Sequence, residues 1–438
     1  MTDTAAPLPE LAEPGPVRQA MTDRLLAEGW ITSGFVEAAF RTVPREVFAP
    51  LGTALADAYP GDKAVITKKD ANGRNISSIS APWLQARMIG QAALRPGMKV
   101  LEVGSGGCNA AILAEVVGRS GHVISVDIDP EITGRAVAAL DTAGYNGRVT
   151  VVTADAEHGV PEFAPYDAII VTVGAWDVPP AWREQVAGDG ALVVPLRMNS
   201  VSRSIGFSAS GDHWQSASAQ VCGFVPIQGI GARPEQTFRL PHPDGGSVVL
   251  RFEDGAPDDL QVASAVLGSA AASEWSGVTV GNEVSFADLQ LWLAGRPGYC
   301  RIGTEDGAVL AGDRSGQGRG RGWFPFAVLD RDTFAYLGLR PVPDSDPPLW
   351  EFGAFAYGPR GEQAAAAFAT EIRKWDQSGR DVPSSAFGYW PAGSTANIPS
   401  GAVIFPKAHG AATVDWGTRG LMTGTPRRLR DSLRGRQR

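Results

Sequence analysis

The segment Val100-Leu101-Glu102-Val103-Gly104-Ser105-Gly106-Gly107-Cys108 decides the fold, because an apolar strand there gives way to a glycine turn and then to an alanine-rich helix. Glycines at such a turn let the backbone approach a ligand closely, and the start of the helix offers free N–H groups to an anionic part of that ligand. The segment therefore predicts an α/β protein that holds a nucleoside-bearing cofactor at Gly104, Ser105 and Gly106.

A second strand ends in an acidic residue where such a cofactor needs one. His122-Val123-Ile124-Ser125-Val126 leads into Asp127, about twenty residues after the glycine turn. A carboxylate in this place accepts hydrogen bonds from the hydroxyl groups of a ribose. We expect Asp127 and its neighbour Ile128 to line the nucleoside part of the site.

The residues around the turn distinguish between cofactors. A dinucleotide fingerprint that starts at Gly104 and Gly106 requires a third glycine three residues later, where this chain has Asn109. Glu102 adds an anionic group beside the turn, which suits the ammonium group of an amino-acid-bearing cofactor better than a pyrophosphate. Both observations predict S-adenosylmethionine. Taken alone, the segment leaves a second interpretation open, in which Glu102 and Asp127 are ordinary carboxylates at strand ends.

Further motifs surround this core in a characteristic order. Upstream lie Val43-Pro44-Arg45-Glu46-Val47-Phe48 and Ser77-Ser78-Ile79-Ser80-Ala81-Pro82-Trp83. Downstream lie Val151-Val152-Thr153-Ala154-Asp155, Tyr166-Asp167-Ala168-Ile169-Ile170-Val171 and Gly190-Ala191-Leu192-Val193-Val194-Pro195. In this order and spacing the chain closely resembles protein-L-isoaspartate O-methyltransferases over residues 18–225.

The resemblance implies roles for particular residues. Ser80 matches the active-site serine of the family, whose hydroxyl donates a hydrogen bond to the carboxylate that accepts the methyl group. Ser78 lies on the same side of the extended segment and assists it, and Ile79 is expected at the substrate. Asp155 matches the carboxylate that binds the adenine amino group, with Ala156 beside it. Without the resemblance, we would interpret the two serines as turn and cap residues before the next helix.

The reaction that the resemblance implies needs neither a metal ion nor a strong base. An aspartyl carboxylate titrates near ~4 and is already ionised at neutral pH, so catalysis can come from placing its oxygen in line with the methyl group. The five histidines show no metal-ligand spacing. We therefore predict no metal site.

The chain departs from the family pattern at two places. It has Gly107-Cys108 where relatives carry a further glycine, and Gly174-Ala175-Trp176-Asp177 where small residues follow the fourth strand. Trp176 is therefore a candidate substrate-binding residue. Either it shapes a pocket for a constrained peptide, or it packs against the C-terminal part of the chain.

Length and composition describe a globular protein with more than one domain. At 438 residues the chain exceeds one methyltransferase core. The net charge of −8 disfavours nonspecific nucleic-acid binding, and no apolar run is long enough to cross a bilayer. The three cysteines form neither a disulfide framework nor a metal-ligand pattern. Since the N-terminus does not resemble a signal peptide, we predict a cytoplasmic enzyme that binds neither nucleic acid nor membrane.

Strands and helices alternate from residue 98 to 195, which predicts a doubly wound, mainly parallel, Rossmann-like sheet. We expect strands at 98–103, 122–127, 148–153, 166–172 and 190–195, and helices at 19–29, 33–42, 107–118, 131–143 and 179–187. The predicted domains are a disordered lead-in at 1–18, a catalytic domain at 19–225, an α+β substrate-recognition domain at 226–422 and a basic tail at 423–438.

Short elements separated by Gly, Pro and Asp follow Phe224. We expect strands at 247–252, 350–357, 402–405 and 412–416, and helices at 285–293 and 361–375. The stretch 314–321 carries three glycines and three arginines, which predicts a loop. The basic run at 426–438 is interpreted as a solvated tail, with contact to an acidic peptide or to RNA as the alternative.

The C-terminal extension bears on the substrate. Its segments Glu351-Phe352-Gly353-Ala354, Ile372-Arg373-Lys374-Trp375-Asp376 and Tyr389-Trp390-Pro391-Ala392-Gly393 resemble those of actinobacterial methyltransferases associated with ribosomally made peptides, including lanthipeptides. That resemblance implies methylation of an aspartyl side chain in a cyclised ribosomal peptide, followed by a succinimide that opens to aspartate or isoaspartate. The alternatives are a general isoaspartate repair enzyme and a noncatalytic peptide-binding module. The sequence does not indicate which oligomeric state the protein adopts.

Overall fold

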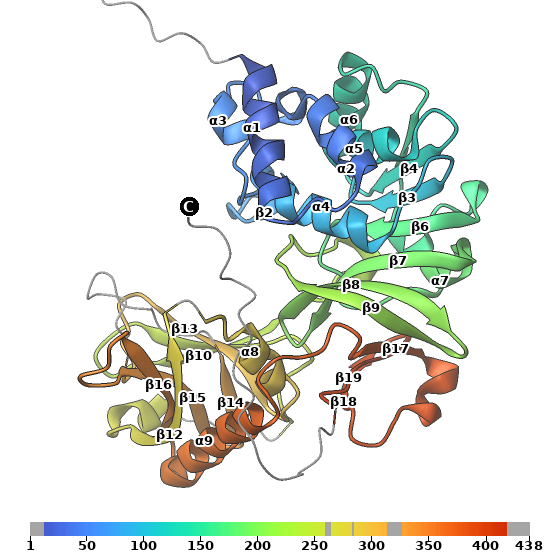
Figure 1. The fold of residues 1–438 in the computed structure, drawn as a ribbon. Coiled ribbons are helices and arrows are strands. Elements are labelled where there is room, and N and C mark those ends of the chain that lie inside the picture. The colour runs from blue at the N-terminus through green and yellow to red at the C-terminus, as the bar shows by residue number, and fades with distance from the viewer. Residues whose placement is uncertain (1–12, 259–263, 283, 313–325, 418–438) are drawn as a thin grey trace, which may run out of the picture.

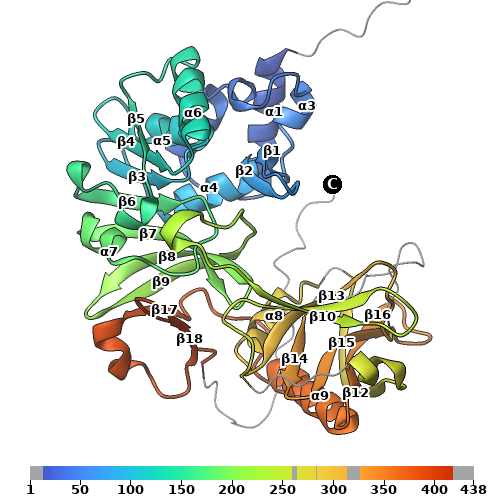
Figure 2. The ribbon, with the colours of Figure 1, turned by 180° about the vertical axis from the view of Figure 1, so that it is seen from behind.

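The computed structural model describes residues 13–258, 264–282, 284–312 and 326–417. The expected basic tail, the expected loop at 314–321 and residues 1–12 of the expected lead-in lie outside this range. The described residues form a ten-stranded and a seven-stranded sheet, which Figures 1 and 2 show lying side by side with the N-terminal helices at one end.

Four short helical segments and a hairpin open the chain. They are α1 (Pro14–Ala27), α2 (Gly34–Thr42), η1 (Arg45–Phe48) and α3 (Leu55–Ala58), followed by β1 (Val65–Lys69) and β2 (Asn75–Ile79). The prediction of a disordered lead-in is wrong for residues 14–18, which are helical. A proline in the first turn of a helix loses no hydrogen bond, and Arg18 anchors the helix by donating to Tyr59 at 3.0 Å and to Glu46 at 3.1 Å.

The expected alternation of helices and strands follows. Its elements are α4 (Pro82–Gln91), β3 (Lys99–Val103), α5 (Cys108–Val117), β4 (His122–Asp127), α6 (Pro130–Thr142), β5 (Val149–Thr153), η2 (Ala156–His158), η3 (Pro161–Phe163), β6 (Tyr166–Val171), α7 (Pro180–Gln185), β7 (Val186–Met198), β8 (Val201–Ser210) and β9 (His213–Val221). Strands β5, β4, β3, β6 and β7 are parallel neighbours in that order. The predicted Rossmann-like fold is confirmed.

The parallel strands β3, β4 and β6 are buried on both faces. Val100 and Leu101 are adjacent in β3, yet they belong to different hydrophobic clusters, because successive side chains of a strand point to opposite faces. One cluster includes α2, α4 and α5. The other includes Trp182 of α7 and continues into the C-terminal part of the chain.

The C-terminal part begins with the short turn η4 (Gly229–Gly231) and then forms a second unit, which we call the lobe. Its elements are β10 (Gln236–Pro241), β11 (Ser247–Phe252), η5 (Ser264–Gly268), β12 (Ala272–Gly281), α8 (Ala287–Ala294), β13 (Tyr299–Glu305), β14 (Ala327–Asp330), β15 (Thr333–Pro341), β16 (Leu349–Tyr357) and α9 (Gly361–Gln377). The strands form one antiparallel sheet in the order β10, β11, β13, β14, β15, β16, β12. Helix α9 packs on this sheet, as its apolar stripe predicts.

The last elements return to the first sheet. They are β17 (Phe387–Pro391), η6 (Ala392–Asn397), β18 (Val403–Lys407) and β19 (Gly410–Val414). Strand β17 pairs with β9, with Tyr389 opposite Trp214, and continues the sheet through β19 to β18. The prediction of one unit over 226–422 is therefore wrong for 387–414. An unpaired edge at β9 would expose backbone hydrogen-bonding groups, and these three strands cover it.

Polar contacts also tie the last strands and the lobe to the loop after β6. The hydroxyl of Tyr389 donates to Asp177 at 2.6 Å, and the backbone N–H of His409 donates to the same carboxylate at 2.8 Å. The indole of Trp176 donates to Asp254 of the lobe at 2.7 Å. The loop after β6 is therefore held by all three parts of the chain.

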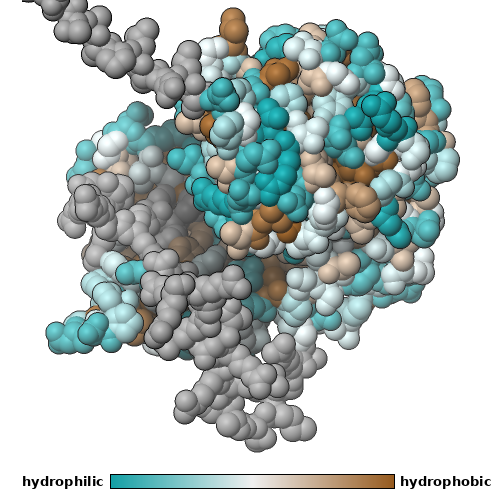
Figure 3. Space-filling view, turned by 45° about the horizontal axis from the view of Figure 1, so that its top comes forward, coloured by the Kyte–Doolittle hydropathy of each residue, from teal (hydrophilic) through white to brown (hydrophobic). Residues whose placement is uncertain are grey.

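The view of Figure 3 looks onto the N-terminal side of the molecule. Hydrophobic residues lie there in small separate patches among hydrophilic ones, as on an ordinary protein surface. Within the described ranges, none of the helices has the length and apolar character that would let it span a membrane.

We expect the variant Tyr389→Phe to lose about 1–2 kcal/mol of unfolding free energy, because it leaves the half-buried acceptor Asp177 with one hydrogen bond fewer. Denaturant unfolding measures this loss. Tyr357→Phe is the control, since the Tyr357 hydroxyl accepts from Ala311 within the lobe. Only Tyr389→Phe should accelerate amide hydrogen exchange in the loop at 174–178. Equal exchange in both variants would contradict the conclusion that Tyr389 holds this loop.

Candidate active site

The glycine turn between β3 and α5 has a backbone that other residues would strain. Gly104 has a φ of +99°, and a Cβ atom there would lie 2.6 Å from the Thr172 Oγ1 at the end of β6. That hydroxyl also donates to the carbonyl of Gly104 at 3.0 Å. On the other side, a Cβ atom on Gly106 would lie 3.9 Å from the carbonyl oxygen of Ser78. The turn is therefore enclosed by β6 and by the end of β2.

Two predicted cofactor residues meet at this turn. The Ser105 N–H donates to Asp127 Oδ2 at 3.0 Å, and the Asp129 N–H donates to Asp127 Oδ1 at 3.0 Å. The Ser105 hydroxyl is buried, and no described residue hydrogen-bonds to it. An orphaned buried hydroxyl requires an explanation. A polar ligand in the turn provides one, so the residues present fit an amino-acid-bearing nucleoside.

Glu102 lies beneath the turn and not beside it, which corrects the expectation that its carboxylate faces the ligand. The side chain is fully buried, accepts from the Ser125 hydroxyl, and accepts from Asn109 Nδ2 at 2.8 Å. Burial raises the pKa of Glu102 to about 7, against the opposing effect of these hydrogen bonds. A direct contact between the Glu102 carboxylate and a ligand would require one of these two hydrogen bonds to be broken.

The expected adenine residues lie together at the far end of the turn, with a segment that the sequence analysis missed. Asp155 Oδ1 accepts from Glu157 N at 3.0 Å, and Asp155 Oδ2 accepts from Ile230 N at 2.8 Å. A Cβ atom on Gly229 would lie 2.2 Å from Asp155 Oδ2 and 2.7 Å from Ile128 Cδ1. The turn η4 therefore closes over Ile128 and Asp155. The two glycines of η4 indicate a turn in the sequence, but no neighbouring residue indicates that this turn packs against Asp155.

The chain after the turn extends this end of the site. Ala156 is buried at the start of η2, directly after Asp155. The predicted domain boundary between 225 and 226 therefore falls beside the cofactor residues, since Ile230 contacts Asp155 from beyond it.

Ser78 and Ser80 lie on the accessible face of the segment, whereas Ile79 does not. Side chains alternate along a strand, and Ile79 points into the core with 3% of its surface exposed. The expectation that Ile79 contacts substrate is therefore wrong. Arg45 fixes the end of this segment, because its Nη2 donates to the Ser80 carbonyl at 2.6 Å.

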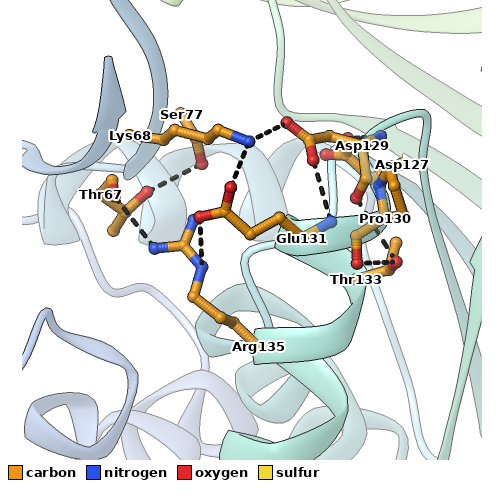
Figure 4. A network of polar contacts seen from close by, with 9 residues as sticks. All are labelled: Thr67, Lys68, Ser77, Asp127, Asp129, Pro130, Glu131, Thr133 and Arg135. Atoms are coloured by element: carbon orange, nitrogen blue, oxygen red, sulfur yellow. Dashed lines mark hydrogen bonds and ion pairs between the residues drawn. The ribbon is translucent and has the colours of Figure 1, made fainter. Parts of the chain in front are cut away.

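Charged side chains join the β1–β2 hairpin to the start of α6 (Figure 4), and we call Lys68, Asp129, Glu131 and Arg135 the clasp. The Lys68 ammonium lies 2.6 Å from Asp129 and 2.7 Å from Glu131. Arg135 donates to the carbonyl of Thr67 at 3.0 Å. Asp129 is two residues after Asp127, the residue expected to bind the ribose. The clasp therefore holds the hairpin that carries Ser78 beside the ribose end of the site.

Trp176 lies away from Ser80, near the adenine end. Two cations lie over its ring: the guanidinium of Arg233, 4.4 Å from the ring centre, and the ammonium of Lys407, 4.7 Å from it. Trp176 also lines a pocket of about 250 Å³ with Glu157, Ile230 and His409. Trp176 therefore lines a pocket and also bonds to the lobe, and its role in binding a constrained peptide stays a prediction.

No cluster of three or more metal-ligating side chains occurs among the residues that the structure describes. The parallel sheet, the glycine turn and the two strand-end carboxylates define a Rossmann-like methyltransferase. A family model described as "Protein-L-isoaspartate(D-aspartate) O-methyltransferase (PCMT)" matches residues 17–230. The enzyme of that name from Hyperthermus butylicus is 38% identical over 221 residues, which cover 48% of this chain and 88% of the relative. The chain belongs to the protein-L-isoaspartate O-methyltransferase family.

Two solved structures are also similar. A protein-L-isoaspartate O-methyltransferase is 21% identical with a TM-score of 0.47 and covers 85% of this chain and 95% of its own. The Plasmodium falciparum protein solved in complex with S-adenosyl-L-homocysteine is 16% identical with a TM-score of 0.42 and covers 48% of this chain and 98% of its own.

We expect Lys68→Met to accelerate dissociation of S-adenosylhomocysteine roughly two- to fivefold, because the clasp no longer holds the hairpin. High salt should accelerate dissociation from the wild type, which has the ion pairs, but not from the variant. Stopped-flow fluorescence measures both effects. Lys69→Met is the control, since Lys69 is the exposed next residue. A salt dependence that persists in Lys68→Met would contradict this role.

The buried carboxylate of Glu102 makes stability depend on pH. Its pKa is raised from 4.5 to about 7, so between these values the folded chain binds the proton more tightly than the unfolded chain. The unfolding free energy should therefore fall as the pH rises through this window. Glu102→Gln removes this contribution. Denaturant unfolding from pH 5 to 8 should show a steeper decline for the wild type than for Glu102→Gln, and parallel profiles would contradict the assignment.

Proposed function

We propose that this protein transfers a methyl group from S-adenosylmethionine to a carboxylate of an aspartyl-derived residue in a peptide or protein. The observation that supports this most directly is the position of Ser78 and Ser80, whose end of β2 lies against the glycine turn. S-adenosylmethionine supplies an electrophilic methyl group on a positively charged sulfur. The turn, Asp127 and the adenine residues Asp155, Ile128 and Ala156 would hold it.

The chain's own contribution is placement. A carboxylate is ionised at neutral pH, so no group of the protein has to remove a proton. Ser80, assisted by Ser78, donates a hydrogen bond to one carboxylate oxygen and leaves the other to attack the methyl carbon. The new C–O bond forms as the S–CH₃ bond breaks, and both charges are neutralised. Correct positioning of two reactants is itself a large part of catalysis.

Family membership favours an isoaspartyl residue in proteins or linear peptides as the general substrate. The lobe favours a narrower substrate, the cyclised ribosomal peptide. The residues beyond 230 lie outside the family match, and they line a cleft of about 640 Å³ between β18 and the lobe and a second of about 390 Å³ against α9. Arg296, Pro297, Val328 and Asp330 border both clefts, so the two clefts are neighbours, and we infer that an extended or cyclised peptide binds along them.

The narrower proposal includes a second step. A methyl ester has a better leaving group than a carboxylate, so a neighbouring backbone nitrogen can attack its carbonyl carbon. Methanol leaves, a succinimide ring forms, and water opens the ring to aspartate or isoaspartate. Mass spectrometry of a linear isoaspartyl peptide and of a thioether-cyclised peptide, each incubated with enzyme and S-adenosylmethionine, distinguishes the substrates. Methylation followed by methanol loss on the cyclised peptide alone supports tailoring, and methylation of the linear peptide alone supports repair.

We expect Ser80→Ala to lower kcat/KM for the methylated peptide by roughly ten- to a hundredfold, the effect of one hydrogen bond to a charged group. Its affinity for S-adenosylhomocysteine, measured by calorimetry, should stay unchanged. Ser77→Ala is the control, because the Ser77 side chain is buried on the opposite face of β2. Equal kcat/KM values for Ser80→Ala and the wild type would exclude Ser80 from the reaction.

A further inference from the structure

A row of four polar side chains, three of them buried, connects Ser80 with the strand beneath the glycine turn. From the guanidinium of Arg45, Nη2 donates to the Ser80 carbonyl and Nη1 donates to Gln85 Oε1, both at 2.6 Å. Gln85 Nε2 donates to Asn109 Oδ1 at 3.2 Å, and Asn109 Nδ2 donates to Glu102 Oε1 at 2.8 Å. We call Arg45, Gln85, Asn109 and Glu102 the relay.

All hydrogen bonds of the relay run in one direction. A guanidinium can only donate, and an ionised carboxylate can only accept. The two amides between them each accept on oxygen and donate on nitrogen. Reversing either amide would bring two donors or two acceptors face to face, so the charged ends fix the orientation of both amides.

The relay also explains how the charge of Arg45 remains buried although no carboxylate lies directly beside it. Arg45 is buried, and its other partners are neutral: the carbonyl of Ala58 at 2.8 Å and the thiol of Cys108 at 3.9 Å. Among the described residues no carboxylate pairs directly with Arg45. An unpaired buried charge is costly, and polarised hydrogen-bond chains are stronger than isolated bonds in a low-dielectric interior.

We propose that the relay fixes the acceptor site relative to the cofactor site, and that Gln85 and Asn109 are positioning residues for methyl transfer. Asn109 is the second residue of α5, directly after the turn, and Arg45 holds the peptide group between Ser80 and Ala81. Because that peptide is trans, fixing its carbonyl also fixes the direction of the Ala81 N–H. The inference rests on the proposed function.

The comparison of Gln85→Met with Gln91→Met tests the relay. Both glutamines lie on α4, and Gln91 also forms two hydrogen bonds, with Ser204 of β8 at 2.6 and 2.9 Å, but these lead away from the site. Methionine keeps the length of the side chain and removes its hydrogen bonds. We expect Gln85→Met to lower kcat about tenfold, as loss of one charge-assisted hydrogen bond would, with Gln91→Met within twofold of the wild type.

A measurement on the ligand-free protein tests the relay without activity. Gln85 and Glu102 both hydrogen-bond to Asn109, so the unfolding free energies of Gln85→Met and Glu102→Gln should be non-additive in the double variant. Gln91→Met combined with Glu102→Gln should be additive. Additivity in both pairs, or equal kcat values for the two glutamine variants, would overturn the relay. If the wild type methylates neither peptide while the stability coupling is present, the proposed function fails and the relay stands.

Discussion

The site depends on one buried carboxylate. Glu102 lies beneath the glycine turn and accepts hydrogen bonds from Ser125 of β4 and Asn109 of α5, so it binds together the three elements that form the turn. A carboxylate without water around it must use its hydrogen-bonding capacity on the protein. This need fixes the start of α5 relative to two strands, and the Ser105 and Asp127 contacts follow from that geometry.

The parts of the fold that the sequence predicts are those with a local cause. The inner parallel strands β3, β4 and β6 are mainly apolar, because both faces of the sheet are covered there, and the order of the strands in the chain follows the alternation with helices. The glycine turn and Asp127 are also predictable from the sequence, because their patterns are local too. Ile79 was misassigned although the rule that places it is simple: in a strand with Ser78 and Ser80 on one face, the residue between them faces the core.

The remaining features arise from pairs of residues far apart in sequence. Ile230 reaches Asp155 across 75 positions, Lys68 reaches Asp129 across 61, and β17 joins β9 across the whole lobe. Each partner has an ordinary local context, so no periodicity or spacing indicates the contact. The strands at 403–407 and 410–414 were recognisable as strands, but their sheet was not, since apolar β-residues fit either sheet equally well.

The return of β17–β19 to the first sheet has a consequence for biosynthesis. Strand β9 ends at Val221 and its neighbour β17 begins at Phe387, so the ribosome must add the entire lobe before the sheet can close. At translation rates of about 5–20 residues per second, the β9 edge stays open for roughly ten to thirty seconds on each nascent chain. During that time it is a surface to which other unfinished strands can add. A nascent chain of this protein is therefore expected to bind a chaperone that shields strand edges until β17 emerges.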